Sequence, residues 1–198
     1  VFKMWACLFP DQLVAQLAVE AVNGSLELSC SVRKHVTVLS PNSASIRGRE
    51  DDIRAHFAKE VLRGWMLGPL YALPFAWVRF CRLGSTEFRL ISDFSAHGTS
   101  SVNDNTYSPL LLSGGYARGC EIRDAIDFFG ADSWLAGADV PSCFRQQLNP
   151  RAILNAMVYS VDDGVFYVDL RHPFGFRPSE WAWQCILAIL CWRLRSIS

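Results

Sequence analysis

Apolar residues recur at helical spacing in several parts of the chain. The spacing predicts a helix from Asp11 to Val22, which Asn23-Gly24 would end. A second helix is predicted from Asp51 to Met66, where apolar residues share one face and acidic residues stand at the positively polarised start. A short helix is predicted around Glu121 to Phe129, and a core helix from Trp181 to Leu194.

Strand patterns fill much of the remaining sequence. From Ala76 to Phe94, aromatic and branched residues are interrupted at Gly84-Ser85, which predicts a hairpin with a tight tip at that pair. A second hairpin is predicted from Met157 to Leu170, because two apolar runs flank Asp162-Asp163-Gly164, a strong turn sequence.

Two further segments complete the outline. The stretch from Ser29 to Arg49 has no period and is expected to form a long extended arm, whereas Trp134 to Val140 is expected to form a buried strand. The strands lie close together in sequence instead of alternating with regular crossover helices. We therefore expect an α+β fold, with an antiparallel sheet and packed helices.

Composition narrows the class of protein. A hydrophobic content of 51% with 19% charged residues excludes a disordered chain. Nineteen basic residues balance nineteen acidic ones, so any basic surface that binds nucleic acid must be confined to a small part of the molecule.

Seven cysteines without a CxxC pair argue against a disulfide framework and a zinc module, and favour a reducing intracellular compartment, either nucleus or cytoplasm. The longest apolar run, Trp181 to Trp192, is shorter than the roughly 20 residues of a membrane span, so no membrane partner is expected.

Five sequence blocks gain meaning from their order and spacing. They are Glu60 to Leu70, Phe88 to Ser95, Ser101 to Asp104, Ala138 to Arg145 and Tyr167 to Arg177. Together they resemble successive motifs of reverse transcriptases. The Ser-Val-Asn-Asp block is similar to the one in retrotransposons of the DIRS and Ngaro type, which use a tyrosine recombinase.

The resemblance implies an RNA-directed DNA polymerase, a nucleotidyltransferase that takes an RNA template, a DNA primer and deoxynucleotides. It also implies a division of the chain: residues 1–50 an N-terminal helix and extended arm, residues 51–132 a fingers-like region, and residues 133–198 a partial palm. The Y-x-D-D motif of the family would follow the last helix. We therefore expect a fragment with fingers and an incomplete palm, truncated before that motif and inactive alone.

Asp139 is the expected catalytic residue and magnesium ligand. Nucleotidyl transfer uses two divalent ions to stabilise the attacking and the departing oxygens, and carboxylates are the ligands that such ions demand. A carboxylate at the end of a buried strand would need a cation as its partner. The two-ion site would be incomplete in this chain. Alternatively, Asp139 caps a helix or forms a salt bridge.

The resemblance assigns four further positions to the nucleotide. Phe144 would lie under its sugar and exclude a 2′-hydroxyl, although a core aromatic is an equal alternative. Phe174 and Gly175 would form the floor of the pocket, where glycine permits close backbone approach. Arg82 and Arg89, on opposite sides of the expected hairpin tip, would bind the triphosphate.

Other readings stay open for several of these residues. Solvated hairpin arginines are common, and Leu83 stands where the family usually has a second basic residue. Tyr159 to Asp163 looks like the Y-x-D-D motif but has one residue too many and precedes Phe174-Gly175, so we expect a turn there. The neutral charge and the unusual Arg177-Pro178-Ser179-Glu180 favour an alternative: a non-catalytic remnant that serves a larger assembly as a structural or RNA-contacting subunit. An unrelated α+β domain with chance matches is the third reading.

Overall fold

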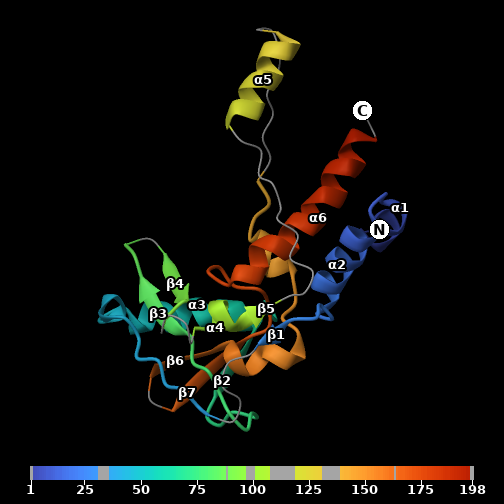
Figure 1. Ribbon diagram of the computed structural model, residues 1–198. Coiled ribbons are helices and arrows are strands. Elements are labelled where there is room, and N and C mark those ends of the chain that lie inside the picture. The colour runs from blue at the N-terminus through green and yellow to red at the C-terminus, as the bar shows by residue number, and fades with distance from the viewer. Residues whose placement is uncertain are drawn as a thin grey trace.

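The chain combines helices with small antiparallel sheets, which confirms the expected α+β class (Figure 1). The computed structural model describes residues 2–30, 36–87, 89–96, 101–107, 119–130, 139–162 and 164–196. None of the helices within these ranges has both the length and the apolar character that crossing a bilayer requires.

The helices α1 (Phe2–Leu8), α2 (Gln12–Asn23) and α6 (Arg177–Arg195) pack together at one end of the molecule. The predictions of α2 and α6 are confirmed. Helix α2 begins at Asp11, whose Oδ1 accepts hydrogen bonds from the backbone of Leu13 and Val14, both at 3.1 Å. It ends at Gly24, which has the left-handed φ of 71° that favours glycine.

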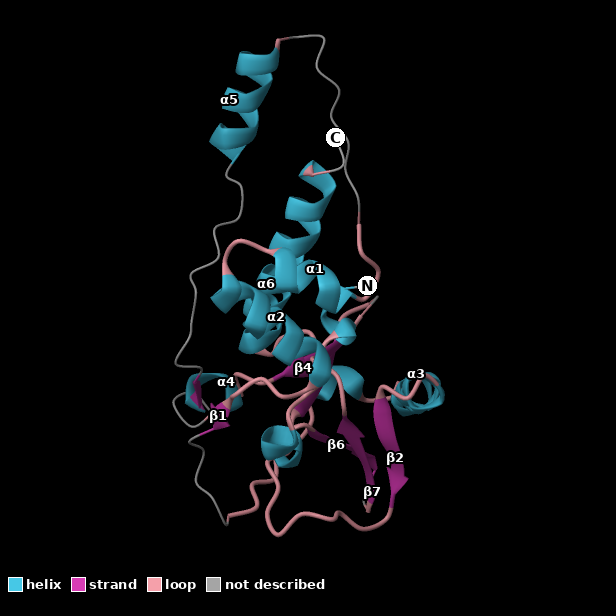
Figure 2. Ribbon diagram, turned by 90° about the vertical axis from the view of Figure 1, so that its right-hand side faces the viewer, coloured by secondary structure: helices cyan, strands magenta, loops and turns pink. Residues whose placement is uncertain are grey.

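A three-stranded sheet lies at the other end, with the strand order β2-β7-β6. Strands β6 (Val158–Asp162) and β7 (Val165–Asp169) form the expected hairpin, which confirms the turn between them. Strand β2 (Met66–Leu70) pairs antiparallel with β7, a pairing that the sequence pattern did not predict (Figure 2). The sheet therefore joins a strand from the first half of the chain to a hairpin from the second half.

Helix α3 (Glu50–Leu62) confirms the second predicted helix but ends earlier than expected. The apolar pattern continued to Met66, whereas the chain turns at Gly64, which has a φ of 68°. Met66 is buried as the first residue of β2. The apolar pattern of α3 therefore continues beyond the end of the helix, because Met66 in strand β2 faces the same core.

The hairpin β3 (Arg82–Ser85) and β4 (Leu90–Asp93) is confirmed, but its predicted tip is wrong. Gly84 and Ser85 are the last residues of β3 and pair with Ile91 and Leu90. The turn lies beyond them, where the backbone of Thr86 donates to the carbonyl oxygen of Arg89 at 2.8 Å. Glycine remains compatible with a strand, so its presence alone did not locate the turn.

The remaining elements are short, apart from one helix. The arm contributes β1 (Ser29–Cys30), which pairs with β5 (Thr106–Tyr107), and the 3₁₀ helix η1 (Ala44–Ile46). Three more are α4 (Val102–Asn105), η3 (Cys143–Gln146) and η4 (Arg151–Ala156). Helix α5 (Gly119–Phe129) confirms the predicted short helix and stands apart in both views, with exposed Phe128 and Phe129 (Figures 1 and 2).

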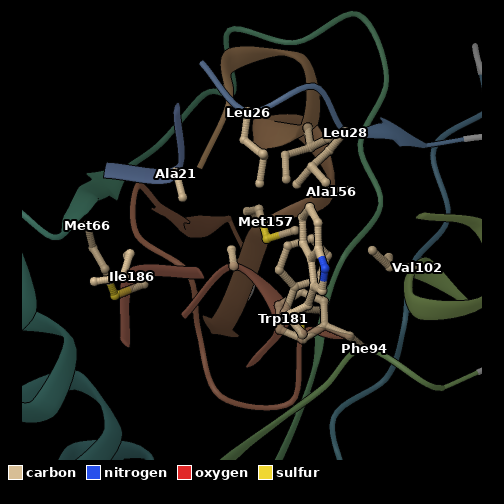
Figure 3. Packing of buried hydrophobic residues seen from close by; sticks show 14 of the residues in the cluster. Ala21, Leu26, Leu28, Met66, Phe94, Val102, Ala156, Met157, Trp181 and Ile186 are labelled. Carbon is tan, nitrogen blue, oxygen red and sulfur yellow. The ribbon is translucent and has the colours of Figure 1, made fainter. Parts of the chain in front are cut away.

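The main hydrophobic cluster joins the helical end to the sheet. Met157, fully buried, lies among side chains from α2, the following loop and α6 (Figure 3). The cluster takes residues from all three segments into which the sequence was divided, from Ala6 to Ile189. The division itself stays a prediction.

Candidate functional site

Two aromatic side chains from separate blocks lie in contact. The rings of Phe144 in η3 and Phe174 after β7 have centroids 4.8 Å apart and an interplanar angle of 57°. Phe174 is 62% exposed, so one side of the pair faces solvent. An aromatic pair of this kind offers an apolar surface to a planar or ring-shaped ligand.

Gly175, next to the pair, lies against the backbone of β4. Its φ is 86°, and a Cβ added there would lie well inside van der Waals contact with the carbonyl oxygen of Ser92. Both observations exclude a side chain at this position. Glycine thus lets the Phe174 turn approach the β3-β4 hairpin closely.

Asn103 ties this turn to two other blocks. Its Nδ2 donates to the carbonyl oxygen of Gly175 at 2.8 Å and to Oγ of Ser95 at 2.9 Å, while its Oδ1 accepts from the backbone N–H of Arg177 at 2.8 Å. The Arg177 guanidinium also donates to Asp104 at 3.2 Å. The blocks at residues 89–95, 101–104 and 174–177 therefore meet at one buried amide.

Arg82 and Arg89 share one face of the β3-β4 hairpin, although not in the way expected. Arg82 pairs with Asp93, and the backbone of Thr86 with that of Arg89, so by strand alternation both arginines point to the same side. They lie at different heights along the hairpin and not symmetrically about its tip. Both are exposed and therefore available to an anion.

A groove of about 470 Å³ runs along this hairpin. Arg82, Asp93 and Gly175 line it, together with hydroxyl side chains of the arm and of both strands. The groove thus links one of the hairpin arginines to the glycine beside the aromatic pair. The other lining residues are Ser43, Ser45, Gly84, Ser85, Ile91, Ser92, Phe94 and Ser95.

Asp139 lies in a different environment from the one predicted. It is exposed and, like Val140, belongs to no strand. The predicted buried strand is therefore wrong at its last two residues, and Trp134 to Ala138 lie outside the described residues. Burial raises the pKa of the Cys143 thiol, and the charge of Asp139 acts in the same direction. Asp139 thus lies at the start of the segment that carries Phe144.

The described residues contain no group of three or more His, Cys, Asp or Glu side chains placed to hold a metal ion. Asp162, in the Tyr159 to Asp163 sequence, forms an ion pair with Arg54 of α3 at the end of β6. Asp163 lies outside the described residues. Within the described ranges, Asp139 is accordingly a lone candidate ligand.

A buried ionic network beside the aromatic pair was missed by sequence reasoning. Nη1 of Arg145 lies 2.6 Å from both carboxylate oxygens of Asp169, and its Nη2 lies 2.7 Å from Oε2 of Glu60. The three side chains are only 11%, 4% and 6% exposed. The Arg145 guanidinium also lies over the ring of Trp65, 5.4 Å from its centroid.

The sequence did contain signals for this network. Glu60 falls on the apolar face of α3, one turn after Phe57, and Asp169 ends the apolar strand β7. A carboxylate in either position needs a cation. The sequence alone could not identify Arg145 as that cation, because it lies far from both in the chain.

Burial shifts two pKa values in this region. Desolvation raises the pKa of Asp169 to about 6, although the charge of Arg145 acts in the opposite direction. Burial, and then the charge of Arg145, lowers the pKa of His172 to about 3. Neither ring nitrogen of His172 has a hydrogen-bond partner within the described part of the chain. His172 is therefore a buried neutral imidazole at pH 7.

Comparison of the sequence with protein-family models and with curated proteins gives no match. The geometry thus has to be interpreted from its own chemistry. Arg82 and Gly175 line the groove, Arg89 lies on the same face of the hairpin as Arg82, and Phe174 of the aromatic pair is next to Gly175. This arrangement is suited to a ligand with a ring and an anionic group.

Proposed function

We propose that the chain carries the nucleotide-facing part of an RNA-directed DNA polymerase of retroelement origin. Arg82 and Arg89 would bind the triphosphate, Phe144 would select deoxyribose, and Phe174 with Gly175 would form the floor of the pocket. The partners of such an enzyme would be an RNA template, a DNA primer and deoxynucleotides.

One observation carries the proposal: blocks matched by sequence order alone come together in space. The buried amide of Asn103 bonds to Ser95, Gly175 and Arg177. Ser95 ends one matched block, Asn103 belongs to a second, and Gly175 and Arg177 share the block of Phe174. The ring contact adds the block of Phe144. A chance set of matches in an unrelated domain has no reason to converge in this way.

Such an enzyme would bind two magnesium ions, and the described residues supply only part of the ligands that these ions need. Asp139 supplies one carboxylate, and no second acidic side chain within the described ranges joins it in a three-ligand group. These residues do not fit a complete two-ion centre. We therefore derive no catalytic step through magnesium, and we expect the chain alone to give no templated primer extension.

Nucleotide binding tests the proposal directly. The chain should bind a deoxynucleoside triphosphate, and Arg82→Ala or Arg89→Ala should each weaken binding by about tenfold, since each removes a charge-assisted contact. Arg123→Ala on α5 removes the same charge from an exposed site and should leave the affinity unchanged. Isothermal calorimetry measures all four proteins. Equal affinities in all of them, or appreciable primer extension with magnesium, would contradict the proposal.

A non-catalytic, reverse-transcriptase-derived subunit is the second candidate. It is favoured by the exposed position of Asp139, which joins no three-ligand group among the described residues, and by the exposed Phe128 and Phe129 on α5. Such a subunit would bind a partner protein or RNA without requiring a nucleotide. Binding of labelled RNA in the absence of triphosphate, unchanged in the Arg82→Ala and Arg89→Ala variants, would support this candidate over the first.

A further inference from the structure

We propose that Arg145 is the positioning residue of the Phe144-Phe174 pair. It joins Glu60 of α3 to Asp169 of β7, and this holds η3 so that Phe144 lies against Phe174. The consequence for a ligand rests on the proposed function: where the pair faces a nucleotide sugar, Arg145 controls the choice between deoxyribose and ribose.

The guanidinium is fixed from two directions. Asp169 holds Nη1 and Glu60 holds Nη2, and both carboxylates are almost fully buried. Removing one partner from a buried ion pair is strongly unfavourable, because it leaves an uncompensated charge in the protein interior. The side chain of Arg145 therefore cannot leave this position without a large penalty.

The short helix transmits this constraint to its neighbour in sequence. Phe144 precedes Arg145 within η3, whose turn is closed by hydrogen bonds from Arg145 N to Ser142 O at 2.9 Å and from Gln147 N to Phe144 O at 3.1 Å. The ring of Phe144 is thus one residue away from an anchored side chain in a closed turn. A shift of the guanidinium would move the ring.

The backbone before η3 gives an independent sign that contacts hold this turn in place. Ser142 has a φ of 53°, the single positive φ of a non-glycine residue in the described ranges. The left-handed region is unfavourable for an L-residue and persists where surrounding contacts impose it. The hydrogen bonds of Arg145 to Asp169 and Glu60 are such contacts.

Arg63 provides a matched control. Its Nη1 donates to the other oxygen of Glu60 at 3.0 Å, and its guanidinium lies 5.1 Å from the centroid of the same Trp65 ring. It is 58% exposed and follows α3, and the two groups to which these contacts are made, Glu60 and Trp65, lie outside η3. Substitution of Arg63 thus perturbs the same carboxylate and indole without releasing Phe144.

Fluorine NMR tests the positioning itself, with 4-fluorophenylalanine at position 144 of the full chain. Wild type and Arg63→Met should give one sharp, shifted resonance, and Arg145→Met a broader one near the position of an exposed ring. Arg145→Lys, which can bind only one carboxylate at a time, should be intermediate; if Arg145→Met does not fold, this variant decides. An unchanged resonance in the folded Arg145 variants overturns the proposal.

Sugar preference tests the consequence. The ratio of the dissociation constants of ATP and dATP, measured with magnesium by tryptophan fluorescence, should fall about tenfold in Arg145→Met and stay constant in Arg63→Met. An altered resonance with an unaltered ratio overturns the role in sugar selection. If wild type binds neither nucleotide, the proposed function fails, and the resonance alone still decides whether Arg145 positions Phe144.

Discussion

At the scale of single residues, the Ser-Val-Asn-Asp block gains a physical explanation. Ser101 caps α4 through its hydroxyl, Val102 enters the core, and Asp104 binds Arg177. Asn103 is the residue that connects separate parts of the chain. The sequence marked this block by resemblance only, because the hydrogen-bond partners of an amide leave no trace in the local pattern.

Replacing Asn103 by alanine should reduce the free energy of unfolding by about 2–3 kcal/mol, because it removes the hydrogen bonds to Gly175 and Ser95 and leaves the backbone N–H of Arg177 without this acceptor. Urea denaturation measures the change.

Asn105→Ala is the matched control for that substitution. Asn105 lies in the same short helix, and its Nδ2 donates locally to the carbonyl oxygen of Ser101 at 2.8 Å. Loss of this local hydrogen bond should reduce the free energy of unfolding by less than about 1 kcal/mol. Equal losses in the two variants would show that Asn103 does not connect the blocks.

At the scale of elements, the sequence pattern predicted those helices and hairpins that are determined by interactions within one short segment. Helices α2, α5 and α6 and the β6-β7 hairpin follow from periodicity and from turn residues within each segment. Strand β2 could not be predicted in this way. It is short, contains Gly68-Pro69, and depends on β7, which lies far away in the sequence.

The N-cap of α2 offers a direct test of one such local interaction. Asp11→Ala should lower the free energy of unfolding by about 1 kcal/mol, because two backbone N–H groups lose their acceptor. Asp11→Asn keeps an acceptor oxygen and should be nearly neutral. Thermal unfolding followed by circular dichroism compares the two variants, and a loss of the same size in both would assign the effect to charge instead of capping.

At the scale of the whole molecule, the sequence predicted the α+β class and named residues that the structure brings together, but not the ionic network beside them. Phe144 and Phe174 meet as a pair, whereas Asp139 is exposed. The network of Glu60, Arg145 and Asp169 depends on three elements packing at once. Such an arrangement cannot be inferred from any single stretch of sequence.

The buried ionisable groups give the fold a predictable dependence on pH. The folded-state pKa of His172 is lowered from 6.5 to about 3, so its contribution to stability is present above pH 6.5 and is lost as the pH falls towards 3. That loss amounts to roughly 4 kcal/mol. The raised pKa of Asp169 acts in the opposite direction: its contribution is present below pH 3.8 and is lost as the pH rises through about 6.

His172→Leu should therefore be distinctly more resistant to acid than wild type between pH 6.5 and pH 4, while Asp169 keeps its opposing effect. Urea denaturation at several pH values measures this difference. His56→Leu on α3 is the control, since His56 is exposed and should contribute much less. Parallel pH profiles of wild type and His172→Leu would show that His172 is not the source of the acid sensitivity.

The central sheet also determines when the protein can fold during synthesis on the ribosome. Strand β2 emerges about a hundred residues before β7, the strand with which it pairs. Until then the edge of β2 has no partner from this sheet, and the nascent N-terminal half keeps apolar surface exposed to chaperones. The final assembly of the fold therefore waits for the hairpin that leads into the Phe174 turn.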